Sequence, residues 1–245
     1  MPGMTAISLV QALRMKVSLI ELKIDGSRHT WDNGLFSDRK IERSGRFPHI
    51  AEDLNKIPWK IRGEVALPQG NVLQLNKRVN WDRARFYPFE VITLNGEDCS
   101  HFPIAMQREL LKRVISEYGL THLAVPQAFN SVNEGWGYVK ETKSEGLVLK
   151  TESNKCYKLK LLQEEKLPIV GYKQGKSKGA FIIERNGGVQ SRVSGTAGVF
   201  VDAYKLLLEQ GKAPYAEIEY QFLTDYGIPF QPRLRRVGTL QDLIT

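Results

Sequence analysis

The eight residues from Glu21 to Arg28 constrain the fold of this chain more than any other stretch. Lys23 follows an apolar, β-prone run that begins at Val17, and Asp25-Gly26 is a strong signal for a tight turn between two antiparallel strands. The sequence therefore predicts a hairpin in which Lys23 ends the first strand, where a side chain can reach into a cleft.

A lysine at such a position can act as a nucleophile. Burial beside other cations lowers the pKa of an ammonium group from about 10.4 towards neutrality, which frees the nitrogen lone pair for covalent chemistry. The same local pattern also occurs in ordinary hairpins with a solvated lysine. The companions of Lys23 further along the chain decide between the two interpretations.

Four motifs in order along the chain resemble those of the covalent nucleotidyltransferases, which include ATP-dependent DNA ligases, RNA ligases and mRNA capping enzymes. The segment from Lys23 to Arg28 resembles the K-x-D-G-x-R signature, and Arg62-Gly63-Glu64 resembles the D/R-G-E element. The segment from Glu145 to Lys150 resembles E-G-[LV]-V-x-K, and Lys158-Leu159-Lys160 resembles K-x-K. Over nearly its whole length the chain is most similar to a minimal ATP-dependent DNA ligase.

This resemblance implies a three-step reaction. Lys23 attacks the α-phosphorus of ATP to give lysyl-AMP, AMP passes to the 5′-phosphate of a nick, and the 3′-hydroxyl then displaces AMP. The resemblance implies ATP and Mg²⁺ as cofactors, nicked duplex DNA as the partner, and Glu145 as a metal ligand. The nucleotide-binding residues that we predict are Glu21, Leu22, Ile24, Arg28, Arg43, Glu64, Phe89, Lys158, Lys160, Arg233 and Arg236.

Some of these assignments are also supported by the residue types. Lys158 and Lys160 are two apart in a β-prone run, so they share one face of a strand, where a triphosphate would relieve their repulsion. Glu64 is an acid inside an apolar strand, and its carboxylate can accept hydrogen bonds from two ribose hydroxyls. Phe89 falls where the family stacks an aromatic ring under adenine, although a core phenylalanine would look the same.

The C-terminal segment departs from the family pattern. Pro232 to Val237 resembles the final motif, whose arginine reaches the ATP pyrophosphate, but the usual ending R-x-D-K is absent because Val237-Gly238-Thr239 follows Arg236. The sequence therefore leaves open which arginine of this segment acts.

The charge of the chain suits a polyanionic partner. It has 35 Lys+Arg against 27 Asp+Glu, a net charge of +8, and basic residues surround Trp81 as in many nucleic-acid contacts. A solvated basic loop would give the same pattern. The residues that we predict to contact DNA are Arg46, Lys77, Arg83, Arg85, Lys176 and Lys178.

The predicted fold class is α+β, with two domains. An adenylation (nucleotidyltransferase) domain of antiparallel sheets and helices is expected over residues 1–163, and a five-stranded OB-fold barrel over residues 164–245. Helices are predicted over residues 50–57, 103–118 and 200–210, and a short helix or arm ahead of residue 17. The charged segment from Gln163 to Pro168 is predicted to be the hinge, with the barrel strands beginning at Ile169.

Other sequence features indicate the cellular compartment and the alternative functions. Cys99 and Cys156 lack metal-ligand spacing, and no signal peptide or transmembrane run is present, so we expect a cytoplasmic monomer without a membrane partner.

An RNA ligase is an alternative function, although many RNA ligases carry Asn where this chain has Arg28 and end in a helical domain. A GTP-using capping enzyme, or a nucleic-acid-binding barrel with an inactive transferase domain, are the others.

Overall fold

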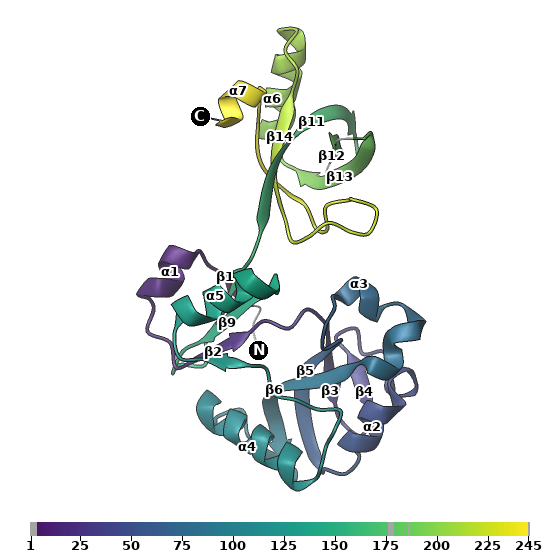
Figure 1. The fold of residues 1–245 in the computed structure, drawn as a ribbon, viewed down its shortest axis with the longest axis vertical. Coiled ribbons are helices and arrows are strands. Elements are labelled where there is room, and N and C mark those ends of the chain that lie inside the picture. Colours follow the sequence, from purple (N-terminus) through teal and green to yellow (C-terminus); the bar gives the residue numbers. More distant parts are fainter. Residues whose placement is uncertain (1–3, 176–178, 186, 245) are drawn as a thin grey trace. The chain divides into compact units, whose positions relative to one another are not determined.

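The computed structural model describes residues 4–175, 179–185 and 187–244, and the chain divides into two compact units, Met1–Leu161 and Leu162–Thr245 (Figure 1). The described residues form three five-stranded sheets and a set of helices. The α+β class is therefore as predicted. None of the helices in the described part of the chain has the length and apolar content that a membrane crossing requires.

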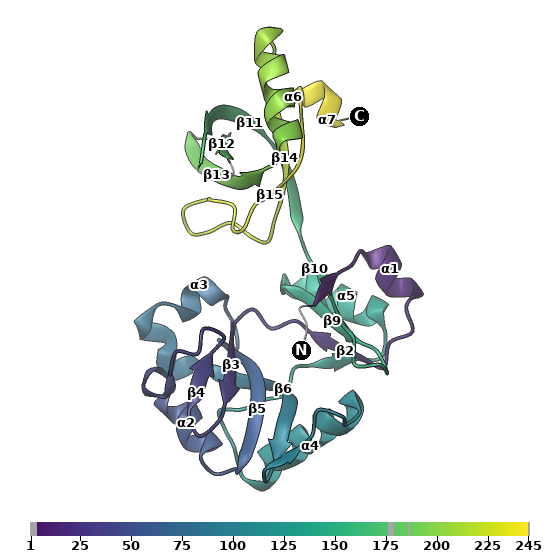
Figure 2. The same cartoon turned by 180° about the vertical axis from the view of Figure 1, so that it is seen from behind.

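The first sheet holds the strand that leads into Lys23. Its order is β1 (Thr5–Ala6), β10 (Cys156–Lys160), β9 (Gly146–Lys150), β2 (Leu19–Leu22) and β8 (Ala128–Phe129). Figure 2 labels its three central strands, β10, β9 and β2. All neighbours are antiparallel except β1 and β10. Helix α5 (Val132–Thr142) covers this sheet and contacts α1 (Leu9–Arg14), and the core between them contains Ile20, Val139, Leu147, Leu149 and Leu159.

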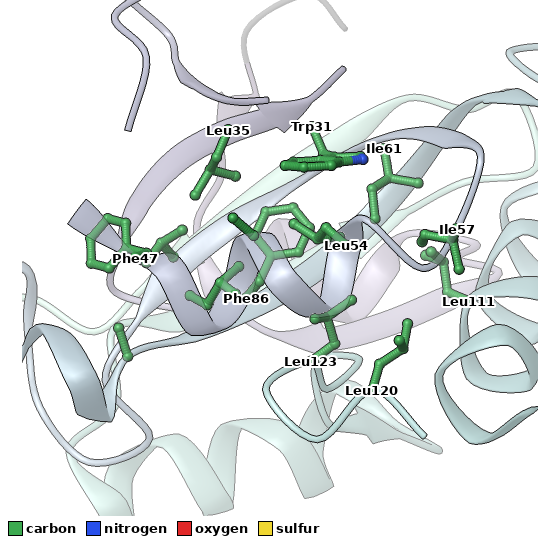
Figure 3. Packing of buried hydrophobic residues seen from close by; sticks show 14 of the residues in the cluster. Trp31, Leu35, Phe47, Leu54, Ile57, Ile61, Phe86, Leu111, Leu120 and Leu123 are labelled. Carbon is green, nitrogen blue, oxygen red and sulfur yellow. The ribbon is translucent and has the colours of Figure 1, made fainter. Parts of the chain in front are cut away.

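The second sheet forms the other half of the first unit. Its antiparallel order is β4 (Leu35–Ser37), β3 (Ser27–Trp31), β5 (Trp59–Ala66), β6 (Arg85–Leu94) and β7 (Glu97–Asp98). Helices α2 (Pro48–Leu54) and α4 (Ile104–Glu117) pack on it, and Figure 3 shows Leu54, Ile61 and Leu111 within their shared core. Short helices η1 (Ser44–Arg46), α3 (Val72–Leu75) and η2 (Arg78–Arg83) connect its elements.

Strand β5 shows how the sequence separates the core from the other face of this sheet. Ile61, Gly63 and Val65 are buried, whereas the intervening Arg62 and Glu64 are only half-buried. Because successive side chains of a strand point to opposite faces, the two charged residues share the face away from the apolar core. That face is available for a polar site.

The predicted hairpin at Asp25-Gly26 is wrong. Strands β2 and β3 belong to different sheets, so the segment between them crosses from one sheet to the other. A two-residue hairpin turn of the expected kind needs left-handed backbone angles, which neither Asp25 nor Gly26 adopts. Gly26 is instead required by packing, because a Cβ atom there would lie 2.4 Å from the carbonyl oxygen of Val65.

The predicted helices are present, with one addition. Helices α1, α2 and α4 and, in the second unit, α6 (Gly198–Glu209) all lie where the periodicity and stop signals indicated. Helix α5 was not predicted, because Gly135 and Gly137 lower its intrinsic helix propensity. Its start nevertheless has a recognisable signal, since the Ser131 hydroxyl accepts a hydrogen bond from Glu134 N at 3.1 Å.

The second unit is a curled antiparallel sheet. Its order is β13 (Val189–Thr196), β12 (Gly179–Arg185), β11 (Gln163–Lys173), β14 (Tyr215–Tyr220) and β15 (Arg233–Gly238), around a core that includes Phe181, Ile183, Val193, Ala216 and Ile218. The edge strands β13 and β15 approach each other to within 8 Å between Cα atoms. Among the described residues no ladder of hydrogen bonds joins them, so the five strands are found but the predicted closed barrel is not.

The segment expected to be a hinge is part of this sheet. Strand β11 begins at Gln163, six residues before Ile169, and its residues from Gln163 to Pro168 pair with β14. Glu164, Glu165 and Lys166 are consecutive charged residues in a partly exposed strand, a pattern that resembles a polar linker in the sequence. Strand β15 was also not predicted as a strand, since it carries three arginines in six residues.

Candidate active site

A pocket in the first unit is built from both of its sheets. Strands β2 and β9 contribute one side, and β3, β5 and β6 the other, with a space of about 650 Å³ that includes solvent at the mouth. The residues that line it are Met4, Glu21, Leu22, Lys23, Ile24, Arg28, Arg62, Glu64, Phe89, Pro126, Val148, Lys150 and Cys156.

Lys23 is held at the edge of the first sheet with its amine in the pocket. Its backbone nitrogen donates to Gly146 O at 2.9 Å, directly after β2 ends. Its ammonium donates to Glu145 Oε2 at 2.6 Å, and the Lys160 ammonium lies 2.7 Å from Oε1 of the same carboxylate. Because the Lys23 side chain is only 13% exposed and Glu145 only 6%, this is a nearly buried group of two cations and one anion.

Glycine at position 146 allows this arrangement. Its φ is +148°, and a Cβ atom there would lie 2.0 Å from Leu159 O. The close approach of β9 and β10 at this point places Glu145 between the two lysines. Lys158, two residues before Lys160, is opposite Val148 in the ladder, and since Val148 lines the pocket, Lys158 lies on the same face. The two lysines therefore share a face as predicted.

Glu64 and Arg28 lie opposite each other on β5 and β3. Arg28 Nε is 3.8 Å from Glu64 Oε1, and this buried nitrogen has no hydrogen-bond partner in the described part of the chain. Burial raises the pKa of Glu64 to about 7, although Lys23 and Arg28 oppose the shift. Burial and the nearby Glu145 charge raise the pKa of Asp25 to about 6. Of these two acids, Glu64 lines the pocket, and its pKa lets it exchange a proton near neutrality.

A β-bulge in β6 places Phe89 in the pocket. Arg62 is opposite Glu90 and Gly63 is opposite Pro88, so Phe89 is the extra residue between them. A bulge shifts the side-chain alternation by one residue, so Phe89 and Glu90 both lie on the pocket side while the next residue returns to the core. Pro88, which cannot donate a backbone hydrogen bond, is tolerated beside such an irregularity.

Glu21 is the second buried acid of the pocket. Its Oε1 accepts a hydrogen bond from Arg108 Nη1, and its Oε2 lies 2.6 Å from Lys150 Nζ. The Lys150 ammonium also lies 3.5 Å from Phe89 O and 5.9 Å from the centre of the Phe89 ring. The carboxylate is thus held between two cations next to the aromatic side chain.

Solved structures with a similar fold include DNA ligases. The chain matches a structure from a structure-function study of Lig E DNA ligases with a TM-score of 0.71 and 16% identity, over 97% of this chain and 100% of that one. It matches the ligase domain of LigD from M. tuberculosis with a TM-score of 0.55 and 16% identity, over 96% and 94% of the two chains.

The chain has the fold of a minimal DNA ligase. A mycobacterial DNA ligase D complexed with ATP and MES also shares this fold, with a TM-score of 0.53 and 18% identity over 97% of this chain and 95% of that one. No protein-family model matches the sequence, and a search of curated proteins gives no significant match. At these identities the likeness establishes the ligase fold, and the chemistry has to be argued from the side chains.

The ligase fold brings together most of the residues predicted to bind a nucleotide. Seven of the predicted positions line the pocket or its floor in the first unit: Glu21, Leu22, Lys23, Ile24, Arg28, Glu64 and Phe89. Lys158, Lys160 and Glu145 lie on β10 and beside Lys23, as described above. Three charged residues near the pocket were not among the predicted site residues: Arg62, Lys150 and Arg108. Lys150 is 4% exposed at the end of β9, and its place as the final lysine of the E-G-[LV]-V-x-K motif is the signal that could have added it.

The predicted arginines outside the pocket have other surroundings. Arg43 precedes η1, its backbone nitrogen donates to Leu35 O at 2.6 Å, and it is not among the described residues that line the pocket. The Arg46 guanidinium lies 4.4 Å from the centre of the Trp81 ring and donates to Leu75 O at 2.9 Å. Arg46 therefore braces η1 against the segment that contains Trp81.

The arginines of β15 differ in their partners. Arg236 donates to Glu217 Oε2 at 2.6 Å and to Leu243 O at 3.2 Å, and Arg235 lies 2.9 Å from Glu219 Oε1. Arg233 is exposed and has no such pair among the residues that the structure describes. Both predicted arginines are exposed, and within the described part of the chain they differ in that Arg236 is held by an ion pair with Glu217.

The residues predicted to contact DNA also separate into groups. Lys77, Arg83 and Arg85 are exposed around η2, as a phosphate-binding surface requires. Lys176 and Lys178 lie outside the described residues.

The side chains around Glu145 decide whether the predicted metal site could hold Mg²⁺. Among the described residues no cluster of three or more His, Cys, Asp or Glu side chains is arranged to hold a metal ion. Glu145 is the carboxylate bonded to Lys23, and Mg²⁺ commonly takes one or two carboxylates together with waters and phosphate oxygens. The site therefore fits an ion that arrives with a nucleotide, with Glu145 as the residue that would hold it.

Proposed function

We propose that this protein is an ATP-dependent DNA ligase that joins the 5′-phosphate and 3′-hydroxyl of nicks in duplex DNA through a lysyl-AMP intermediate. The observation that carries the proposal is the Lys23 amine, which is nearly buried in the pocket and bonded to Glu145, with a second lysine on the same carboxylate. The likeness to DNA ligase structures, one of them complexed with ATP, supports ATP as the donor.

The pocket has a direction that suits a nucleotide. Glu21 and Lys23 are two residues apart along an extended backbone, so they point to one side with their Cα atoms roughly 7 Å apart. With the α-phosphate at Lys23, the base would lie towards Glu21 and Phe89. Glu64 would lie beside the ribose, where its carboxyl can accept or donate a hydrogen bond because its pKa is about 7.

The first step transfers a nucleotidyl group to nitrogen. A bond forms between Lys23 Nζ and the α-phosphorus, the bond from that phosphorus to the bridging oxygen of the β-phosphate breaks, and pyrophosphate leaves with the electron pair. The amine must lose a proton for this attack, and Glu145 Oε2 accepts its hydrogen bond at 2.6 Å. Such transfers depend mainly on positioning and on neutralisation of phosphate charge.

The neutralising groups are side chains of this chain. Lys160 and Lys158 lie on the face that meets the phosphates, and Arg28 has an unpartnered buried nitrogen directed towards the same pocket. Mg²⁺ bound with the triphosphate would supply further positive charge. We further propose that Arg233 contacts the pyrophosphate and that Lys77, Arg83 and Arg85 contact the DNA backbone, because their charged groups are exposed.

A labelling experiment tests the nucleophile. Protein incubated with α-labelled ATP and Mg²⁺ should retain the label after denaturation, and Lys23→Ala should retain none. Lys16→Ala is the matched control, because Lys16 is in the preceding segment, is 88% exposed and lies 3.5 Å from the exposed Glu152. Equal labelling of Lys23→Ala and wild type would contradict the proposal.

The substrate is tested separately. Wild-type protein should join a nicked DNA duplex and leave the same nick in RNA largely unjoined. Preferential joining of RNA would identify an RNA ligase, and labelling from GTP in place of ATP would identify a capping-type enzyme. Either result would overturn the assignment to DNA while keeping Lys23 as the nucleophile.

A further inference from the structure

Helix α4 carries one arginine to the back of the pocket wall. Arg108 is only 10% exposed, and its Nη1 donates to Oε1 of Glu21, which is 4% exposed. Arg108 is not a lining residue, whereas Glu21 is. It therefore reaches the site from behind and acts on any ligand only through Glu21.

Arg108 differs from the other charged residues of α4 in being buried. The helix keeps its other charges at the surface, where Lys112 pairs with Glu109 at 2.7 Å and Arg113 pairs with Glu117 at 2.6 Å. Burying charged groups costs several kcal/mol per ion before pairing is counted, and an apolar residue packs a helix against a sheet at lower cost. Arg108 lies on the buried side of the helix, four residues after Ile104 and three before Leu111, where an apolar residue would be expected.

The second cation fixes the other oxygen of the same carboxylate. Lys150 Nζ is 2.6 Å from Glu21 Oε2 and is itself fixed by its position beside Phe89. With one oxygen bonded to Arg108 and the other to Lys150, the plane of the Glu21 carboxylate is set. Each oxygen still has a lone pair that can accept one N–H donor from a ligand in the pocket.

We propose that Arg108 is a positioning residue that holds the Glu21 carboxylate in the orientation in which it reads an exocyclic amino group of the nucleotide base. The inference rests on the proposed use of ATP. Loss of Arg108 frees one oxygen of Glu21 and lets the carboxylate turn towards Lys150. The base contact is then misplaced while Lys23, Glu145 and Lys160 keep their places.

The test compares ATP with purine riboside triphosphate, which lacks the 6-amino group. Intact-protein mass spectrometry measures the rate at which each nucleotide forms its adduct on the full chain with Mg²⁺. We expect wild type to prefer ATP by about a hundredfold or more, because a site that pairs an N–H group rejects an analogue without it. In Arg108→Ala that ratio should fall by roughly 10- to 100-fold, mainly through a higher KM for ATP.

Two further variants keep the test decisive. Arg113→Ala, on the exposed face of the same helix, should keep the wild-type ratio. Arg108→Lys retains the charge but not the guanidinium geometry, so it should give an intermediate ratio, and it replaces Arg108→Ala if that variant does not fold. A purely structural role would slow both nucleotides equally and leave the ratio unchanged.

The possible results are distinguishable. An unchanged ratio in Arg108→Ala and Arg108→Lys, or a wild-type protein that does not distinguish the two nucleotides, overturns the role of Arg108 and leaves the ligase proposal intact. Absence of any adduct from ATP in wild type overturns the proposed function itself. A ratio that falls in both Arg108 variants and not in Arg113→Ala supports the inference.

Discussion

Replacing Glu64 by glutamine tests whether the pocket keeps an acid that weakens the fold. The Glu64 side chain is 16% exposed, and burial raises its pKa from 4.5 to about 7. A glutamine has nearly the same shape and remains neutral, so it resembles the protonated acid at every pH. The substitution therefore removes the cost of ionising a buried carboxyl and leaves the packing nearly unchanged.

The magnitude follows from the pKa difference between the folded and unfolded chains. Below pH 4.5 the carboxyl is protonated in both states and costs nothing. Between pH 4.5 and 7 the folded protein keeps a proton that the unfolded chain has lost, so wild-type stability falls as the pH rises, and above pH 7 the loss is complete. At ~1.4 kcal/mol per pH unit, the full effect is about 3 kcal/mol.

Tryptophan fluorescence is a suitable measurement, because all four tryptophans, Trp31, Trp59, Trp81 and Trp136, belong to the first unit. Urea unfolding at pH 5 and pH 8 should show that Glu64→Gln gains about 2 to 3 kcal/mol relative to wild type between these values. Glu109→Gln, whose side chain is 68% exposed, is the control and should show no such gain. An equal stability difference at both pH values would refute the reasoning.

Three further substitutions test the backbone at two glycines and the lysine pair at Glu145. Gly26→Ala should destabilise the first unit by about 1 to 3 kcal/mol, because its Cβ would collide with Val65 O; Gly137→Ala, inside α5 with no atom within 4 Å, should stabilise it by about 0.5 to 1 kcal/mol. Equal urea midpoints for these two variants would contradict the packing argument. Glu145→Gln leaves two buried ammonium groups without their shared anion, so we expect a loss of about 3 to 5 kcal/mol in the same urea assay, and wild-type stability would count against a buried pair.

The motifs predicted the chemical groups of the pocket better than its backbone. Lys23, Glu64, Glu145 and Lys160 are far apart in the sequence, and the family pattern was sufficient to expect them in one place. The connection after Lys23 was misread because Asp-Gly is a local turn signal. Packing of Gly26 against β5, a contact between distant segments, decides its conformation instead.

The sequence pattern did not predict the ion pairs between residues that are far apart in the chain. Arg108 and Glu21 are 87 positions apart, and the periodicity of α4 indicated only a helix that covers a sheet. The same limit applies to the second unit, where Glu217 and Glu219 of β14 pair with arginines of β15. Arg236 and Glu217 are opposite each other there, but the sequence shows only two polar segments.

The crossing from β2 to β3 limits how this protein can be engineered. The backbone nitrogen of Lys23 is tied to Gly146 in one sheet, and three residues later Gly26 is in close contact with Val65 of the other. An added residue in this short segment would shift either the amine or the second sheet. Acceptance of bulkier nucleotide analogues therefore has to be sought at Phe89 or Met4, on walls of the pocket that can be changed without moving the amine.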